Sequence, residues 1–213
     1  MQTVYYSLLH LYILLLEIIT VIKHPSLWKF FLYFQMEYLF FSPYYYASKG
    51  NQGNDTFGFT PLNTIHRIIK VARKNVTGNN NLLDLGSGDC RILFFLSIVY
   101  GYNCKGIEAN EKFVNKALFI NKMLKLNNLE ILATDFMNVS WQNYAIIFIA
   151  WTTFSLEMIS LINDKLVKEQ AEGDLVITLS FPVEIEAYEV IFQGLFLFSW
   201  GRNKVFISRR LVK

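Results

Sequence analysis

Residues 82–91 read Leu-Leu-Asp-Leu-Gly-Ser-Gly-Asp-Cys-Arg and carry the clearest fold signal in the chain. The two leading leucines predict a short buried strand, the glycines at 86 and 88 predict a turn, and the apolar run that follows Arg91 predicts a helix. Glycine lets the backbone approach a ligand where a Cβ would collide, and the start of a helix offers free N–H groups. The order strand, glycine turn, helix therefore predicts a nucleotide-type binding loop in an α/β domain.

Acidic residues follow at the ends of the next two predicted strands. Glu108 comes 20 residues after Gly88, where an acid accepts hydrogen bonds from both hydroxyls of a ribose. Asp135 and Phe136 end the third strand, where an acid and an aromatic ring suit an adenine. Asp84 precedes the glycines, which is unlike a dinucleotide fingerprint, and this order of acids is the one expected of an S-adenosylmethionine site. The alternative is an α/β protein whose strand ends happen to be acidic.

These motifs resemble the class I (seven-β-strand) methyltransferases. More narrowly, residues 82–182 are similar to the membrane-associated protein-lysine methyltransferases that act on the mitochondrial ATP synthase c subunit and the adenine nucleotide translocase. The matching stretches are 84–89 with 91–92, 106–110 with 113–114, 135–136 with 139–140, 146–150, 163–166 and 180–182. The resemblance implies a Rossmann-like α/β fold with a mostly parallel seven-stranded sheet in the order 3-2-1-4-5-7-6, and a hydrophobic helical extension at the N-terminus.

The resemblance also implies a cofactor, S-adenosyl-L-methionine, and a lysine of a membrane protein as methyl acceptor. The residues expected to bind the cofactor are Asp84, Gly86, Ser87, Gly88, Glu108, Ala109, Asp135, Phe136 and Thr60. No metal site is expected, because the two cysteines lack CxxC spacing and the chain has only three histidines.

The third glycine of the family's loop is Cys90 in this chain. We expect a helical conformation there, which needs no positive φ and tolerates the small cysteine. The rival interpretation is a catalytic thiol, because a position near a helix N-terminus lowers a thiol pKa.

The methyl acceptor should meet the cofactor at the carboxyl end of the fourth predicted strand, residues 144–150. Trp151 follows that strand and is a candidate for lining a lysine channel, since its π-face favours a cation. The alternative is that Trp151 packs against the next helix. Glu157 is a candidate carboxylate near the site. Desolvation and a nearby positive charge lower a lysine pKa, so a dedicated base is not required.

The N-terminal segment is unusually hydrophobic and aromatic. The chain is 53% hydrophobic and only 17% charged, and 14 of its 35 aromatic residues lie in residues 1–46. Residues 4–22 are long enough to cross a hydrocarbon core and contain one acid, Glu17, near one end. We therefore predict that residues 1–24 form a transmembrane or membrane-anchoring helix. Basic residues follow this run, which places the N-terminus outside and the catalytic domain on the cytoplasmic or matrix side. A buried core helix is the alternative.

Residues 25–46 predict an aromatic amphipathic helix, which either lies in the lipid interface or packs on the domain. Residues 47–60 predict a loop that ends with Thr60 as helix N-cap, and residues 61–213 the catalytic domain. The net charge of +3 is too small to indicate a nucleic-acid partner.

Three functions remain open from the sequence. The first is a membrane-anchored methyltransferase that modifies a lysine of a membrane or membrane-adjacent protein. The second is the same fold acting on a lipid or a small hydrophobic molecule. The third is a non-catalytic cofactor-binding or scaffolding protein. The sequence makes no prediction of oligomeric state.

Overall fold

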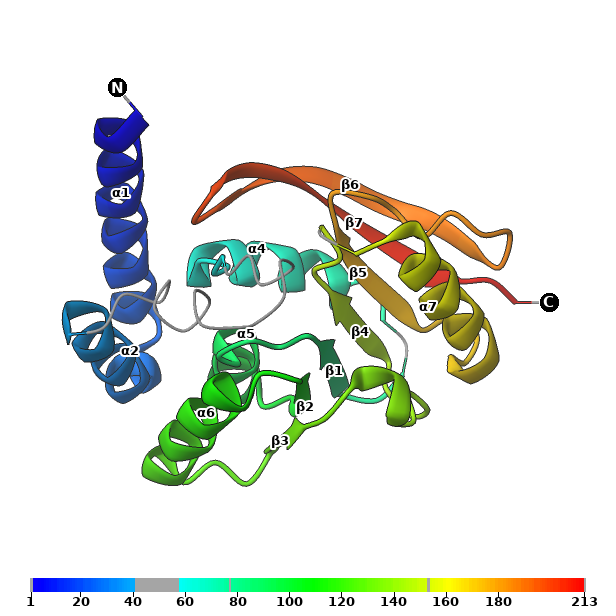
Figure 1. The fold of residues 1–213 in the computed structure, drawn as a ribbon, viewed down its shortest axis with the longest axis horizontal. Coiled ribbons are helices and arrows are strands. Elements are labelled where there is room, and N and C mark those ends of the chain that lie inside the picture. Colours follow the sequence, from blue (N-terminus) through cyan, green and yellow to red (C-terminus); the bar gives the residue numbers. More distant parts are fainter. Residues whose placement is uncertain (1, 41–57, 77, 153, 213) are drawn as a thin grey trace.

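A seven-stranded sheet forms the centre of the molecule, with helices on both faces (Figure 1). This computed structural model describes residues 2–40, 58–76, 78–152 and 154–212, and only the backbone of residues 2–7 and 35–40. The strands are β1 Asn81–Leu85, β2 Asn103–Glu108, β3 Leu129–Ala133, β4 Ile146–Ile149, β5 Leu175–Leu179, β6 Tyr188–Phe198 and β7 Gly201–Arg210. The α-helices are α1 Gln2–Lys23, α2 Trp28–Phe40, α4 Leu62–Ala72, α5 Arg91–Phe95, α6 Glu111–Leu124 and α7 Leu156–Glu169. Short 3₁₀ turns lie at Pro25–Leu27 and Phe136–Asn138, and a π-helical turn at Leu96–Tyr100 continues α5.

The sheet order is β3-β2-β1-β4-β5-β7-β6, which confirms the expected order. Neighbouring strands are parallel from β3 to β5, and β7 is antiparallel to both β5 and β6. The parallel order brings the carboxyl ends of β1, β2, β3 and β4 to one edge, where a ligand crevice is expected. Strand β4 is shorter than the predicted 144–150.

Two hydrophobic cores lie on the two faces of the sheet, because successive strand residues point to opposite sides. Leu82 faces the first core, which α2, α4 and α5 cover, and Leu83 faces the second, which α7 covers. Phe30 and Phe34 of α2 are buried in the first core and pack on Phe94 of α5. The sequence left two predictions for the aromatic helix, a position in the lipid interface and packing on the domain. The buried Phe30 and Phe34 rings confirm packing on the domain for this face of α2. Residues 41–46 lie outside the described residues, as does the predicted loop up to residue 57.

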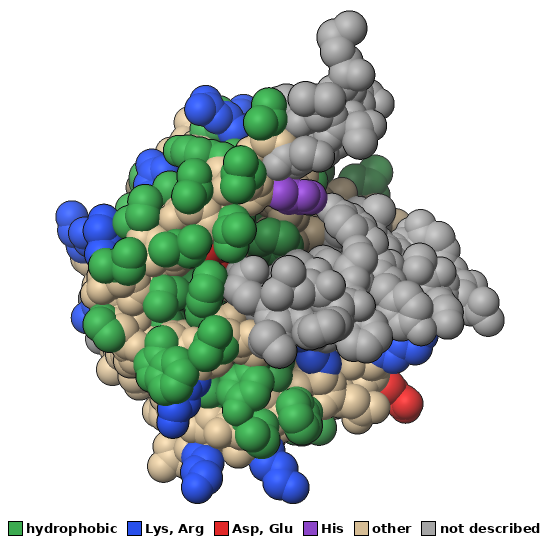
Figure 2. All heavy atoms as spheres, turned by 90° about the vertical axis from the view of Figure 1, so that its left-hand side faces the viewer, with side chains coloured by type: hydrophobic (Ala, Val, Ile, Leu, Met, Phe, Trp, Pro, Cys, Tyr) green, Lys and Arg blue, Asp and Glu red, His purple; other side chains and the backbone are tan. Residues whose placement is uncertain are grey.

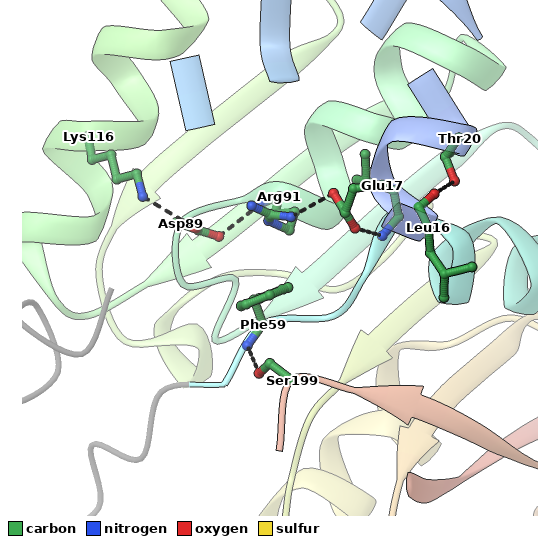
Figure 3. A network of polar contacts seen from close by, with 9 residues as sticks. Leu16, Glu17, Thr20, Phe59, Asp89, Arg91, Lys116 and Ser199 are labelled. Carbon is green, nitrogen blue, oxygen red and sulfur yellow. Dashed lines mark hydrogen bonds and ion pairs between the residues drawn. The ribbon is translucent and has the colours of Figure 1, made fainter. Parts of the chain in front are cut away.

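Helix α1 packs on α4 through one face, and its single acid lies on that face. Glu17 is 2% exposed, and its carboxylate pairs with the Arg91 guanidinium at 3.0 Å (Figure 3). The other Glu17 oxygen accepts the Leu62 N–H at 2.7 Å. Burial raises the pKa of Glu17, and Arg91 and the Leu62 N–H oppose that rise. The Glu17 carboxylate thus points into the domain, where it contacts Arg91 and Leu62, and not toward the end of α1.

The start of α4 corrects one prediction. Pro61, and not Thr60, is the N-cap of α4, and no side chain at the N-cap position caps the helix. Glu17 of α1 accepts the free N–H of the first turn instead, and its negative charge also favours the positive end of the helix dipole.

No single helix among the described residues is long and apolar enough to cross a membrane. One pair meets the length and hydropathy requirement together, residues 8–23 and 25–34, but it is bent by 118°. The membrane-spanning helix of residues 1–24 stays a prediction.

We predict that Glu17→Gln destabilises the fold by about 3–5 kcal/mol, since it breaks the buried ion pair with Arg91. Urea unfolding followed by circular dichroism measures the loss. The matched control is Glu130→Gln, which removes the partner of Lys105 in an ion pair where the Glu130 side chain is 58% exposed. That change should cost about 0–1 kcal/mol. Equal losses in the two variants contradict the account.

Candidate active site

A cavity of about 900 Å³ opens at the carboxyl ends of β1, β2 and β4. All nine residues expected to bind a cofactor line it: Asp84, Gly86, Ser87, Gly88, Glu108, Ala109, Asp135, Phe136 and Thr60. The sheet order explains this convergence, because β1 lies between β2 and β4 and all three run in the same direction.

The loop after β1 turns through left-handed backbone at three positions. Gly86 has φ of 76° and Gly88 has φ of 53°, which glycine adopts without steric cost. The N–H groups of Gly86 and Ser87 both donate to the Ile107 carbonyl, which fixes the loop against β2. The loop therefore curves back over the strand ends and lines the cavity with its backbone.

Cys90 is the third left-handed residue, with φ of 58° and ψ of 20°. The expectation of a helical conformation without positive φ is wrong, because the turn imposes this geometry whatever residue fills it. For a residue with a Cβ, the left-handed region costs about 1–2 kcal/mol. The Cys90 thiol is fully buried 3.3 Å from the Ser87 hydroxyl, and Gly106 makes room: a Cβ there would lie 3.1 Å from the Cys90 sulfur.

Burial also argues against a catalytic thiol. It raises the pKa of Cys90 well above its usual value, and the Asp84, Asp89 and Glu108 carboxylates act in the same direction. The thiol is therefore neutral at physiological pH, and only the thiolate is nucleophilic.

Glu108 stands at the end of β2, beside the glycine turn. Its two carboxylate oxygens accept the N–H groups of Gly88 and Asn110, each at 2.8 Å. These bonds hold the carboxylate at the cavity wall. A carboxylate has about four lone-pair sites in all, so it is a group that can accept several donors at once.

Asp84 lies at the end of β1 and is 2% exposed. Burial, together with the neighbouring Glu108 and Asp89 carboxylates, raises its pKa to about 8. A cation in the cavity would reverse this effect, because an opposite charge nearby favours the ionised carboxylate. The chemistry of this wall thus suits a positively charged ligand.

Asp135 and Phe136 form the wall beyond β3. The Asp135 side chain accepts the Met137 N–H at 2.8 Å and remains exposed at the cavity. The Phe136 ring stacks on Phe154, with centroids 5.8 Å apart and planes 23° apart. Phe154 follows β4, so the two rings join the ends of separate strands into one aromatic wall.

Two acceptor-site candidates do not lie where the sequence predicts. Trp151 is 1% exposed and packs with Ile162 and Leu166 of α7, and its indole N–H donates to the Phe181 carbonyl at 3.0 Å. This corrects the channel-lining prediction and supports the packing alternative. Glu157 is exposed in the first turn of α7, where its neighbours Ser155 and Met158, and not Glu157 itself, line the cavity.

Other residues line the cavity that the sequence did not indicate. Phe59 and Trp200 come from opposite ends of the domain, and the Phe59 N–H donates to the Ser199 hydroxyl at 2.9 Å. Ser180 follows β5 with φ of 71°, and the Asn203 amide donates to its hydroxyl at 2.8 Å. Ser180 lies two residues before Pro182, which weakly indicates a turn at this position. No sequence pattern predicts that Phe59 contacts Ser199 or that Ser180 contacts Asn203, because each pair is far apart in the chain.

Solved methyltransferase structures align with this fold. An RNA methyltransferase from Salinibacter ruber in complex with S-adenosyl-L-homocysteine aligns at a TM-score of 0.60 and 19% identity, over 73% of this chain and 95% of that one. Magnesium protoporphyrin IX methyltransferase from Synechocystis PCC 6803 with bound SAM aligns at 0.55 and 15% identity, over 70% and 79%. The chain has the class I methyltransferase fold. No family model and no curated protein matches the sequence.

We predict that neither cysteine reacts readily with iodoacetamide in the native protein at pH 8. Burial raises the pKa of Cys104 to about 12, which lowers its thiolate fraction roughly a thousandfold below that of a free cysteine. Cys90 is shielded in the same way. Mass spectrometry should find both alkylated only in urea. Rapid, stoichiometric labelling of native Cys90 contradicts this and revives the catalytic thiol.

Asp84 should make the stability depend on pH. Its folded pKa of about 8 lies above its unfolded value of 3.8, so its contribution is fully present below pH 4 and is lost as pH rises through 8. We therefore predict that Asp84→Asn gains stability relative to the wild type across this window, by at most about 1.4 kcal/mol per pH unit. Urea unfolding of both proteins between pH 5 and 9 measures the difference, and a constant difference contradicts the assignment.

Proposed function

We propose that this protein is an S-adenosylmethionine-dependent methyltransferase. The observation that carries the proposal is the convergence of the glycine turn and the Asp84, Glu108 and Asp135 carboxylates on one cavity at the strand ends. The fold matches solved methyltransferases with bound SAM or S-adenosyl-L-homocysteine, which supports the same ligand here.

The cavity suits each part of this cofactor. Glu108 would accept hydrogen bonds from the ribose hydroxyls, and Asp135 and Phe136 would hold the adenine amino group and cover its ring. Asp84 would balance the positive charge of the cofactor. The Gly86–Gly88 backbone leaves the space that these contacts need.

When bound, the cofactor supplies a methyl group on a sulfonium, which an acceptor takes by in-line displacement. The chain's part is to hold the acceptor in line and to exclude water, since proximity supplies much of the rate. Neutral groups that line the cavity would do this: Phe59 before α4, Thr152 and Phe154 after β4, Ser180 after β5, Trp200 between β6 and β7, and Asn203 of β7.

We propose that the acceptor is a lysine amine of a membrane or membrane-adjacent protein. Aromatic faces such as Phe154 and Trp200 favour an approaching ammonium group. The same apolar surroundings lower the pKa of that ammonium and release the amine for attack, so the chain needs no carboxylate base. The apolar surface of α1 supports a substrate at a membrane.

Methyl transfer from radiolabelled cofactor to isolated membranes tests the proposal. Label in protein that hydrolyses to methyl-lysine supports it. Label in the lipid extract indicates a lipid or small hydrophobic acceptor and overturns the lysine assignment. Cofactor binding without label in either fraction favours a non-catalytic protein.

Glu108 variants test the cofactor site separately. We predict that Glu108→Ala abolishes binding of S-adenosylhomocysteine in calorimetry, and that Glu108→Gln weakens it at least tenfold, about 1.4 kcal/mol. The Gln variant keeps one acceptor oxygen for the loop, so circular dichroism should show an intact fold. Glu130→Gln, on the exposed part of β3, is the control and should bind as the wild type does. Unchanged affinity in Glu108→Ala overturns the site assignment.

A further inference from the structure

Helix α1 buries its one acid and exposes apolar side chains. Its buried face carries Leu9, Ile13, Glu17 and Thr20, and Glu17 is the one charged residue between positions 8 and 22. Between positions 8 and 22 the exposed side chains are all apolar: Leu8, Leu11, Tyr12, Leu15, Ile18, Ile19 and Ile22, with exposed fractions from 38% to 71%. A helix on a water-facing surface normally directs its polar residues outward. This exposed face is therefore built to contact something apolar.

The apolar surface continues beyond α1. Trp28 and Leu32 of α2 are about half exposed, and so are Leu118, Phe119 and Met123 of α6, which packs beside α2. Figure 2 views the side of the molecule where these helices lie and shows hydrophobic side chains spread across it. Large contiguous apolar patches on a soluble surface mark interaction sites.

Positive charges border this surface. Among the described side chains of α1, the turn and α2, the exposed charged ones are Lys23 and Lys29, both cationic. Lys122 and Lys125 follow near the end of α6. Figure 2 shows lysine and arginine side chains at several edges of the face. An apolar face bordered by lysines is typical of helices that lie at an anionic lipid interface.

We infer that the exposed faces of α1 and α2 dock on an anionic bilayer with α1 lying in the membrane plane. A second copy of this chain is a poorer occupant, because a symmetric contact brings the lysines of one copy toward those of the other. A neutral apolar partner would leave the lysines without a counter-charge.

Helix α1 cannot both span a bilayer and keep its contacts with the domain. To cross the membrane it would have to withdraw Glu17 from Arg91 and from the Leu62 N–H, which breaks a buried ion pair and a buried hydrogen bond. Lying flat, α1 keeps both contacts and buries only its apolar side in lipid. This arrangement replaces the spanning topology and does not depend on the protein being a methyltransferase.

Vesicle binding of the full-length protein tests the docking surface. The probe is a vesicle of phosphatidylglycerol and phosphatidylcholine, with pure phosphatidylcholine as the comparison. We expect binding to the anionic vesicles, at least tenfold weaker binding to the neutral ones, and at least a tenfold loss in the triple variant Leu11→Ser, Leu15→Ser, Ile18→Ser. The matched control changes three exposed leucines elsewhere, Leu156→Ser, Leu161→Ser and Leu195→Ser, and should bind as the wild type does.

A depth measurement separates the flat helix from a span. Single cysteines replace Leu8, Leu15 and Ile22, which lie on one stripe of α1 over about 21 Å, and carry a fluorophore that brominated lipids quench. The native cysteines are buried and stay unlabelled. A flat helix gives the same shallow depth at all three positions. Greatest depth at position 15 indicates a span and overturns the inference.

Two further outcomes also overturn it. One is a wild-type protein that does not bind either vesicle. The other is a protein that sediments as a dimer and becomes monomeric only in the α1 triple variant, because the surface then serves a second copy. Circular dichroism and urea unfolding of each variant show that the loss of vesicle binding is not a loss of folding.

Discussion

The buried ion pair between Glu17 and Arg91 connects the N-terminal helices to the cofactor loop. Arg91 is the first residue of α5 and directly follows the glycine turn, so its position depends on the same backbone that lines the cavity. Glu17 also satisfies the first turn of α4. Removing either charge breaks a buried ion pair, which proteins tolerate poorly. Helix α1 is therefore a part of the cofactor domain and not an appendage to it.

Further contacts extend this connection around the loop, as Figure 3 shows. The Asp89 carboxylate accepts the Arg91 N–H and pairs with Lys116 of α6 at 3.3 Å. The Arg91 guanidinium lies 4.9 Å from the Phe34 ring centroid and 4.6 Å from that of Phe59, so α2 and the segment before α4 contact the same group. A membrane or partner that binds α1 and α2 would thus contact the same helices that position Arg91 beside the cavity.

The sheet order and the cofactor side of the cavity could be predicted from the sequence, because local patterns determine them. The glycine turn and the acids at successive strand ends brought all nine expected residues to one cavity, because parallel strands end at one edge. The partner of Glu17 was not predictable, since an apolar run carries no sign of which face meets the domain. The positive φ of Cys90 follows from the turn and not from the residue. Trp151 turned inward because the Phe181 carbonyl, 30 residues away, accepts its N–H.

Hydrogen–deuterium exchange with and without S-adenosylhomocysteine tests the central claim, that α1 and the cofactor loop form one unit. If Glu17 joins them, ligand binding at residues 84–91 should slow exchange there and also in the part of α1 around Glu17. Residues of β6 far from the cavity serve as the internal reference and should not change. Protection confined to the loop, with exchange in α1 unaltered, would contradict the account.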